Sequence, residues 1–240
     1  MSDYRTELYD AYDIHTAALD SSDAEKLAWF ESYARANYLP HLRDLPREGS
    51  TLLEIGCNKG YLLAALRSEG FQELAGIDLA PADLERAREI VPGVSLECTD
   101  ASAYLRSRRG SFDAIVMKAV LEHVPKDDVI GLLRDISLSL SPRGVALIDV
   151  PNMDWLFAAH ERYMDFTHEV GFTRESLMQV AGRAFSDVTI VPIVAAPPSR
   201  RAALKRRVGT WLLGTLLEWA DPEGGGNPIW ARGLLAVARP

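Results

Sequence analysis

Short apolar runs alternate with amphipathic segments from Ser50 onward, and this alternation predicts strand–helix units that build a parallel sheet. The predicted strands are residues 51–55, 73–78, 94–97, 114–117 and 145–150. The predicted helices between them are residues 61–68, 81–90, 102–106 and 127–140. Gly70, Pro92-Gly93 and Pro142-Arg143-Gly144 stand where helices must stop and the chain must turn. The pattern predicts the α/β class.

The two ends of the chain break this rhythm. Apolar and aromatic residues recur at helical spacing over residues 24–42, and Pro40 and Pro46 end that pattern. After Val150 come a loop at 152–172, a helix at 173–184, a strand at 187–191 and a last strand at 233–238. We therefore expect an N-terminal helical arm or lid over 1–49 and one domain over 50–240, with a helical insertion at 195–228.

Composition narrows the class of protein. The 240 residues are 48% hydrophobic and 25% charged, and 26 Lys and Arg against 34 Asp and Glu give a net charge of −8. This balance excludes disordered and collagen-like chains and argues against general binding of nucleic acid, which needs clustered positive charge. Two cysteines, Cys57 and Cys98, form neither a disulfide framework nor a zinc spacing. No signal-peptide pattern opens the chain and no apolar run is long enough to span a membrane, so we expect a cytoplasmic protein.

A nucleotide site is indicated where the first three strands end. The first strand runs into a turn that contains Gly56 and Gly60, and such a turn lets a ligand approach backbone N–H groups. Asp78 closes the second strand and Asp100 closes the third, where carboxylates can meet ribose and base. The turn fits neither Gly-x-Gly-x-x-Gly nor a phosphate loop, because Asn58 and Tyr61 replace the needed glycines and Lys59 precedes Gly60.

In these motifs the chain resembles class I S-adenosylmethionine-dependent methyltransferases. The matching segments are Leu53-Glu54-Ile55-Gly56-Cys57-Asn58-Lys59-Gly60, Ile77-Asp78, Thr99-Asp100-Ala101, Phe112-Asp113-Ala114-Ile115-Val116 with Val120-Leu121-Glu122-His123-Val124, and Leu140-Ser141-Pro142-Arg143-Gly144 before the fifth strand. They fall within residues 50–150. The resemblance implies a Rossmann-like seven-stranded sheet, mostly parallel with an antiparallel last strand and helices on both faces. It also implies S-adenosyl-L-methionine as cofactor and S-adenosyl-L-homocysteine as product.

The resemblance also implies a set of cofactor-binding residues. Glu54, Gly56, Cys57 and Gly60 would hold the methionine part, Asp78 the ribose, and Asp100 with Ala101 the adenine. The expected site also includes Asn58, Tyr61, Leu79 and Lys118. Asn58 stands where many members carry glycine, which leaves the contact with the carboxypropyl group open. Tyr12, Tyr38 and Tyr61 are candidates for an aromatic face beside the sulfonium, with core packing as the alternative.

The acceptor site is expected in residues 151–185, where ionisable and aromatic side chains are interleaved. An alcohol loses a proton when its oxygen is methylated, and imidazole is the usual base. We predict His168 as that base, oriented by Asp165 or Glu169; the alternative is that His168 braces the helix beginning near Thr173. His123 is the alternative base or a wall of the cofactor pocket.

A metal ion is not part of the expected site, although a role for one stays open. His160-Glu161 is followed by Met164 where a zinc motif needs histidine. Asp154, Asp165 and Glu169 could still supply oxygen ligands for magnesium.

The acceptor is expected to be a sugar or glycan. Residues 163–173 with Glu175-Ser176-Leu177 resemble a subgroup that O-methylates bacterial glycans and lipopolysaccharide. The alternatives are a methyltransferase for quinones or secondary metabolites and a non-catalytic cofactor-binding module. Nucleic acid is not an expected partner, because Met117-Lys118-Ala119-Val120 stands where a base-flipping tetrapeptide would follow the fourth strand.

A late basic segment bears on where the protein works. Arg200, Arg201, Lys205, Arg206 and Arg207 precede apolar residues at helical spacing that include Trp211 and Trp219. A helix over 200–219 could lie on an anionic membrane surface and reach lipid-linked acceptors; the alternative is packing on its own domain or on a second copy. The oligomeric state is left open.

Overall fold

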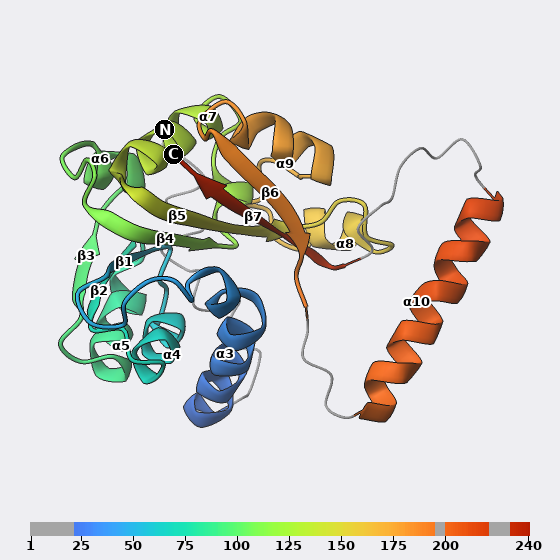
Figure 1. Ribbon diagram of the computed structural model, residues 1–240, viewed down its shortest axis with the longest axis horizontal. Coiled ribbons are helices and arrows are strands. Elements are labelled where there is room, and N and C mark those ends of the chain that lie inside the picture. The colour runs from blue at the N-terminus through green and yellow to red at the C-terminus, as the bar shows by residue number, and fades with distance from the viewer. Residues whose placement is uncertain (1–21, 195–199, 221–230) are drawn as a thin grey trace.

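The structure is a computed structural model, and it describes residues 22–194, 200–220 and 231–240. Tyr12 and the flanks of the predicted insertion lie outside these residues. Figure 1 shows one sheet with helices packed on both sides and a long helix standing beside the main body.

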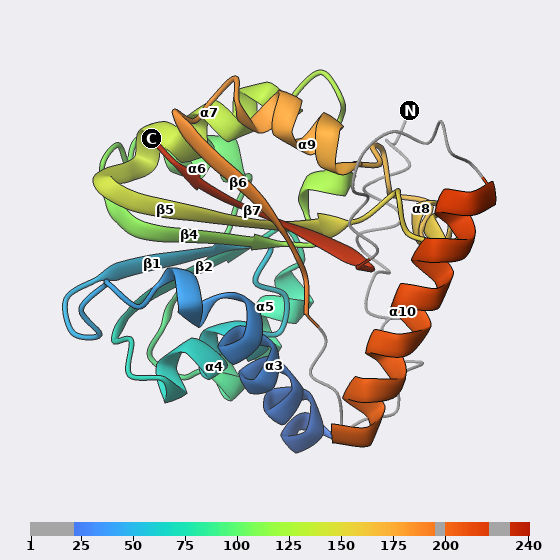
Figure 2. The same ribbon diagram turned by 45° about the vertical axis from the view of Figure 1, so that its right-hand side comes forward.

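Seven strands form the sheet in the order β3-β2-β1-β4-β5-β7-β6. They are β1 (Thr51–Ile55), β2 (Glu73–Asp78), β3 (Ser95–Cys98), β4 (Phe112–Lys118), β5 (Leu140–Pro151), β6 (Asp187–Pro192) and β7 (Gly233–Arg239). β1, β2, β3, β4 and β5 pair in parallel, while β7 runs antiparallel to both β5 and β6. The predicted fold, including the antiparallel last strand, is confirmed (Figure 2).

Two hydrophobic cores cover the two faces of the sheet. The helices are α3 (Asp23–Asn37), α4 (Tyr61–Ser68), α5 (Pro81–Ile90), α6 (Ala101–Arg106), α7 (Val129–Ser139), α8 (Ala158–Tyr163), α9 (Arg174–Ala181) and α10 (Arg200–Ala220), with short 3-10 turns η1 (Leu39–His41) and η2 (Leu121–His123). One core joins alternate strand residues to α6, α7 and α9, and the other joins the opposite face to α3, α4 and α5. The central strands are buried on both faces, which explains their nearly continuous apolar sequence.

This arrangement aligns the carboxyl ends of the central strands. Ile55 of β1 is in register with Ile77 and with Met117, and Lys118 of β4 pairs with Asp149 of β5. The residues that follow these positions meet at one edge, where open α/β sheets bind their ligands.

Several predicted boundaries shift. β3 begins one residue later than expected, and β5 includes Pro142-Arg143-Gly144, which the sequence analysis assigned to a turn. A register shift between Phe112 and Ala114 accommodates this segment beside β4. The N-terminal helix ends at Asn37, with Pro40 in η1.

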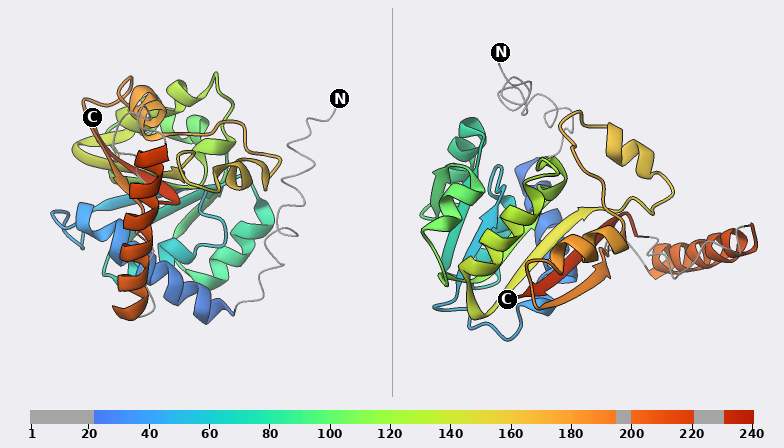
Figure 3. Two further views of the ribbon diagram at one scale, coloured as in Figure 1. Left: turned by 90° about the vertical axis from the view of Figure 1, so that its right-hand side faces the viewer. Right: turned by 90° about the horizontal axis from the view of Figure 1, so that it is seen from above.

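Two helices of the C-terminal half lie in the segments predicted as the acceptor site and the insertion. A short helix, α8, lies within the segment predicted as a loop. The helical insertion is α10, which Figure 3 shows apart from the sheet. In the described parts of the chain, no helix is both long enough and apolar enough to cross a membrane.

The N-terminal helix is fixed at both ends. Ser22 and Glu25 form a capping box at its start, which satisfies backbone donors that the first helical turn leaves unpaired. Ala34 and Tyr38 enter the core beside α4. As a result, the aromatic residues of α3 lie next to the carboxyl edge of the sheet.

Candidate active site

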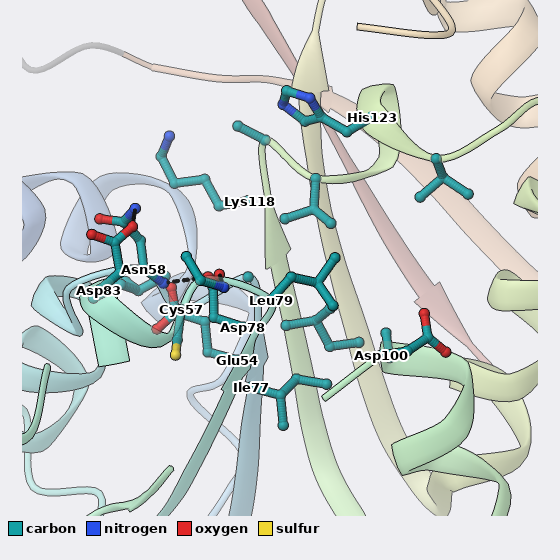
Figure 4. Close-up of a pocket in the computed structure, with 18 of the residues that line it drawn as sticks. Glu54, Cys57, Asn58, Ile77, Asp78, Leu79, Asp83, Asp100, Lys118 and His123 are labelled. Carbon is teal, nitrogen blue, oxygen red and sulfur yellow. Dashed lines mark hydrogen bonds between the residues drawn. The ribbon is translucent and has the colours of Figure 1, made fainter. Parts of the chain in front are cut away.

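A cavity of about 1260 Å³ opens at the carboxyl edge of the sheet. Pockets for small molecules usually hold about 300–1,000 Å³, so there is room for a cofactor and a second ligand. Every residue predicted to bind the cofactor except Gly60 lines this cavity, and so does His123. Figure 4 shows His123 at one end of the labelled residues and Ile77 at the other.

The turn after β1 comes close to its neighbours. Gly56 and Cys57 donate backbone hydrogen bonds to the carbonyl of Ile77, at 2.8 and 3.0 Å. Gly56 has φ +72°, and a Cβ placed on it would lie 2.2 Å from Cγ2 of Val120. Only glycine fits there, because any side chain would both strain the backbone and overlap Val120. Gly60, with φ +77°, precedes α4, and a Cβ placed on it would lie 2.9 Å from Cγ1 of Val91 and 3.1 Å from Cβ of Ala87.

Asn58 replaces the family's glycine without disrupting the turn. Its φ is +46°, a conformation that asparagine tolerates better than most residues. Its N–H donates to Oδ2 of Asp78 at 2.8 Å, and its Nδ2 donates to Oδ2 of Asp83 at 2.5 Å. Asp83 is buried and also lies 3.8 Å from Nζ of Lys59. The sequence analysis missed Asp83, although an acid in the first turn of the helix after Asp78 was a usable signal.

Glu54 carries an unsatisfied polar atom into the cavity wall. Its side chain is 4% exposed, and its Oε2 has no hydrogen-bond partner in the described structure. Burial raises the pKa of this carboxyl well above its ordinary value; the charge of Asp78 adds to the effect and Lys118 opposes it. A buried carboxyl group with a vacant acceptor fits the ammonium group of the cofactor's methionine part. The glycine turn and Glu54 therefore fit S-adenosylmethionine.

The residues predicted to hold the adenosine lie at the ends of β2 and β3. Asp78 accepts from the N–H groups of Asn58 and Ala80, which fix its carboxylate at the strand end. Leu79 is 54% exposed in the cavity and offers an apolar face to a flat base. Asp100 caps α6 by accepting from the N–H of Ala103 at 2.9 Å, and Ala101 follows it in the wall.

Lys118 is directed toward the aromatic residues of α3. Its Nζ lies 5.2 Å from the ring centre of Tyr33 and 5.7 Å from that of Trp29. Tyr33 donates to Oδ2 of Asp149, and Tyr38 donates to the same oxygen at 2.9 Å. Burial raises the pKa of Asp149, while Lys118 and the two tyrosines oppose that shift. Asp149, which the sequence analysis missed, thus anchors α3 to the end of β5.

Tyr38 and Tyr61, two of the residues predicted as candidates for an aromatic face beside the sulfonium, lie in different surroundings. Tyr38 is buried and bonded to Asp149, so it has the packing role given as its alternative. Tyr61 lines the cavity and stacks on Phe30, with ring centres 5.8 Å apart. Its hydroxyl donates to Asp23 of α3 at 2.5 Å. Of the two described candidates, Tyr61 is therefore the one that lines the cavity.

Two distant segments meet at the acceptor end. The carbonyl of Glu122 in η2 accepts from the N–H of Glu169 at 2.7 Å and from that of Val170 at 3.1 Å. These bonds bring His168 beside His123, with ring centres 4.6 Å apart. The two histidines predicted as alternative bases therefore form one pair.

Each imidazole is oriented through its Nδ1. Nδ1 of His168 lies 2.8 Å from the carbonyl oxygen of Glu161, which can only accept, so this nitrogen carries the proton. Nδ1 of His123 lies 2.8 Å from Oγ1 of Thr167, whose hydroxyl donates to Asp165 at 2.6 Å. In the neutral form of each ring, the lone pair therefore lies on Nε2. Asp165, predicted to orient His168, is connected through Thr167 to His123.

The carboxyl group of Glu122 completes this cluster. Glu122 is 2% exposed, and neither of its carboxyl oxygens has a hydrogen-bond partner in the described structure. Burial raises its pKa to about 8. Burial also lowers the pKa of His123 to about 4, and the neighbouring His168 adds to that shift. Burial alone would raise the pKa of Asp165, but hydrogen bonds from Thr167 hold it below its usual value.

One group of three candidate ligands meets at this end in the described residues: Glu122, His123 and His168, whose ligand atoms all lie within 4.8 Å of one another. The carboxylates considered for magnesium, those of Asp154, Asp165 and Glu169, do not form such a group in the described structure. Glu122 was missed because it was read only as part of a widespread motif.

Comparison with known proteins agrees with this geometry. Residues 28–186 match the sequence profile of a family described as a methyltransferase domain. A ubiquinone biosynthesis O-methyltransferase of Neisseria meningitidis is 28% identical over 123 residues, 49% of this chain and 50% of that protein. A tRNA U34 carboxymethyltransferase of Pseudoalteromonas translucida is 26% identical over 143 residues, 58% of this chain and 41% of that protein.

Solved structures show the same fold. A SAM-dependent methyltransferase from Archaeoglobus fulgidus aligns with a TM-score of 0.70 at 18% identity, covering 96% of this chain and all of the other. The chain spans about half the length of the curated relatives it matches.

Proposed function

The chain belongs to the methyltransferase-domain family of class I S-adenosylmethionine-dependent enzymes, and we propose that it transfers the methyl group to a hydroxyl of a sugar or glycan. The observation that supports an oxygen acceptor is the pair of His123 and His168 at the acceptor end of the cavity. In the neutral form of each imidazole, the bond at Nδ1 places the lone pair on Nε2. A hydroxyl is a weak nucleophile until its proton is removed or its oxygen is polarised, and this pair offers the means.

The cofactor, when bound, supplies a methyl group already activated by the sulfonium charge. The residues of this chain bind it, exclude water and align the acceptor for in-line displacement. Glu54 would hold the ammonium group and Asp78 the ribose. Tyr61 provides the aromatic face nearest the methionine part.

The proton of the acceptor hydroxyl is handled by the imidazole pair. His168 was predicted as the base, and its place beside His123 is compatible with that role. His123 lines the cavity itself, so it is the imidazole that an acceptor meets first. His168→Asn and His123→Asn should each lower turnover far more than they lower the affinity for S-adenosylhomocysteine. Unchanged turnover in either variant would remove that histidine from the reaction.

A sugar acceptor is supported by the composition of the segment that carries His168. Tyr163, the last residue of α8, and Phe166 are 79% and 80% exposed, and in the sequence they are interleaved with His160, Asp165 and His168. Aromatic faces next to polar groups suit a ring that has both apolar faces and several hydroxyls.

A phenolic or quinone precursor is the second candidate. It is favoured by the similarity to proteins named ubiquinone biosynthesis O-methyltransferase. Transfer of a labelled methyl group to nucleotide sugars, lipid-linked saccharides and catechols distinguishes the two. Labelling of catechols alone would contradict the sugar proposal. Cofactor binding without labelling of any acceptor in a broad lysate screen would favour the non-catalytic module.

Helix α10 supports a place at a membrane surface. Its apolar side chains at helical spacing are exposed, with Trp211 at 67% and Trp219 at 84%. Arg201, Lys205 and Arg207 lie in its first half. We propose that this face binds anionic lipid, where tryptophan inserts and the basic residues meet head groups. Vesicles containing phosphatidylglycerol should sediment the protein, whereas phosphatidylcholine vesicles and the W211A/W219A variant should not. Dimer formation lost in that variant would instead show packing on a second copy.

A further inference from the structure

We propose that Glu122, His123 and His168 bind a divalent transition-metal ion at the acceptor end of the cavity. Metal binding is independent of the acceptor's identity. The use of the ion to hold an acceptor hydroxyl rests on the proposed function.

The separation of the three side chains suits one ion. One ligand atom from each lies within 4.8 Å of the other two. Around zinc, ligands at about 2.0–2.1 Å stand about 3.4 Å from one another in tetrahedral geometry. The side chains therefore need only small rotations to close on an ion.

The hydrogen bonds on the imidazoles orient both rings through Nδ1. Nδ1 of His168 is occupied by the carbonyl of Glu161, and Nδ1 of His123 by Thr167, which Asp165 holds in turn. Both rings are thus oriented through Nδ1, and in a neutral imidazole so oriented the lone pair that can bind an ion lies on Nε2. A ligating histidine in proteins almost always has such a partner on its other nitrogen.

The burial of Glu122 is a separate observation that points to a ligand. A carboxyl group that is 2% exposed normally has hydrogen-bond partners, yet both of its oxygens lack them in the described structure. A cation would satisfy one or both oxygens. The backbone of the same residue fixes Glu169 and Val170, so the segment carrying His168 is tied to this point.

The donor set selects the class of ion. Two imidazoles and one carboxylate match the protein ligands of His₂Glu zinc sites, which leave a position open for substrate. Magnesium prefers oxygen ligands, so two imidazoles disfavour it. His123 lines the cavity, and an open position on its side would face the acceptor.

Within the proposed function, the ion lowers the pKa of a coordinated acceptor hydroxyl. The O–CH₃ bond forms as the CH₃–S bond breaks, and the bonding pair of CH₃–S goes to sulfur. With the ion bound, the Nε2 lone pairs are used in coordination, so the hydroxyl proton goes to water and not to the imidazole pair; the products are the methyl ether, S-adenosylhomocysteine and a proton. In this arrangement His168 and His123 are metal ligands, whereas the sequence analysis predicted that one of them acts as the base.

The test is calorimetric titration of the EDTA-treated, dialysed full chain with Zn²⁺, with no cofactor or acceptor present. One ion should bind per chain, with affinity at least tenfold weaker in H168N and in E122Q. T167V, which removes the bond that orients His123, should weaken binding about 10- to 100-fold. H160N is the matched control, because His160 is exposed and outside the cluster, and it should bind as the wild type does.

The outcomes separate the ion from the acceptor. Absence of zinc binding, or binding undiminished in H168N, E122Q and T167V, would overturn the inference. H168N keeps the test valid if the buried E122Q variant fails to fold. Zinc binding together with failure to methylate any sugar supports the ion site and contradicts only the proposed acceptor. Methylation of sugars by protein that binds no zinc supports the proposed acceptor and contradicts the ion site.

Discussion

Replacing Gly56 with alanine tests how closely the cofactor turn is packed. The new Cβ would stand 2.2 Å from Cγ2 of Val120, about 0.8 Å inside the 3.0 Å that real Cβ contacts observe. Overpacking of this kind costs about 1–3 kcal/mol. The φ of +72° adds the cost of a left-handed alanine, about 1–2 kcal/mol. Gly56→Ala should therefore lower the free energy of unfolding by about 2–5 kcal/mol.

A matched control separates the two costs. Gly110 has φ +65°, and a Cβ there would meet nothing within 4 Å. Gly110→Ala should thus lower the free energy of unfolding only by the cost of the left-handed backbone, about 1–2 kcal/mol. Val120→Ala removes the atom that clashes, so the double variant with Gly56→Ala should recover about 1–3 kcal/mol relative to additivity.

Urea denaturation measures these free energies, and calorimetry measures the affinity for S-adenosylhomocysteine. We expect Gly56→Ala to weaken that affinity at least tenfold, about 1.4 kcal/mol, because the turn and Val120 both line the cavity. A Gly56→Ala protein as stable as Gly110→Ala, with no coupling to Val120, would refute the close approach.

Two further predictions concern buried polar groups. Tyr38→Phe removes one of the two hydroxyls that donate to the buried Asp149 and should lower the free energy of unfolding by about 1–3 kcal/mol. The control, Tyr163→Phe at an exposed site, should change it by under about 0.5 kcal/mol. Equal effects of the two variants in urea denaturation would contradict the role of Tyr38 in anchoring Asp149. The depressed pKa of His123, about 4 against an ordinary 6.5, makes the unfolded chain bind an extra proton between those values, so stability falls as pH drops from 6.5 toward 4. In EDTA, His123→Asn should be less acid-sensitive than the wild type over this range, by on the order of 3 kcal/mol; an unchanged pH profile would show that His123 is not buried as a neutral ring.

The sequence predicted the sheet well because its strands are short apolar runs bounded by strong turn residues. The 51–55 and 73–78 strands match β1 and β2, since their burial on both faces leaves little freedom in register. The segment at Pro142 was misread because a turn sequence can also be absorbed by a strand irregularity. Local pattern does not distinguish these two outcomes.

The cofactor turn was predictable because its residues are contiguous. The acceptor end was less so, because its pairing depends on backbone bonds between Glu122 and the 169–170 segment. Asp149 could have been identified from the sequence, because it is an acid inside the apolar run of the fifth strand. The reason for this buried acid is visible only in the structure, where Tyr33 of α3 and Tyr38, which follows α3, donate hydrogen bonds to it.

The central claim, that this cavity holds S-adenosylmethionine, is tested most directly by calorimetric titration of the wild-type chain with S-adenosylhomocysteine. We expect one site per chain, with binding lost or weakened at least tenfold in Asp78→Ala, which removes the carboxylate at the end of β2. Absence of binding heat at several temperatures, or equal affinity in Asp78→Ala, would contradict the claim.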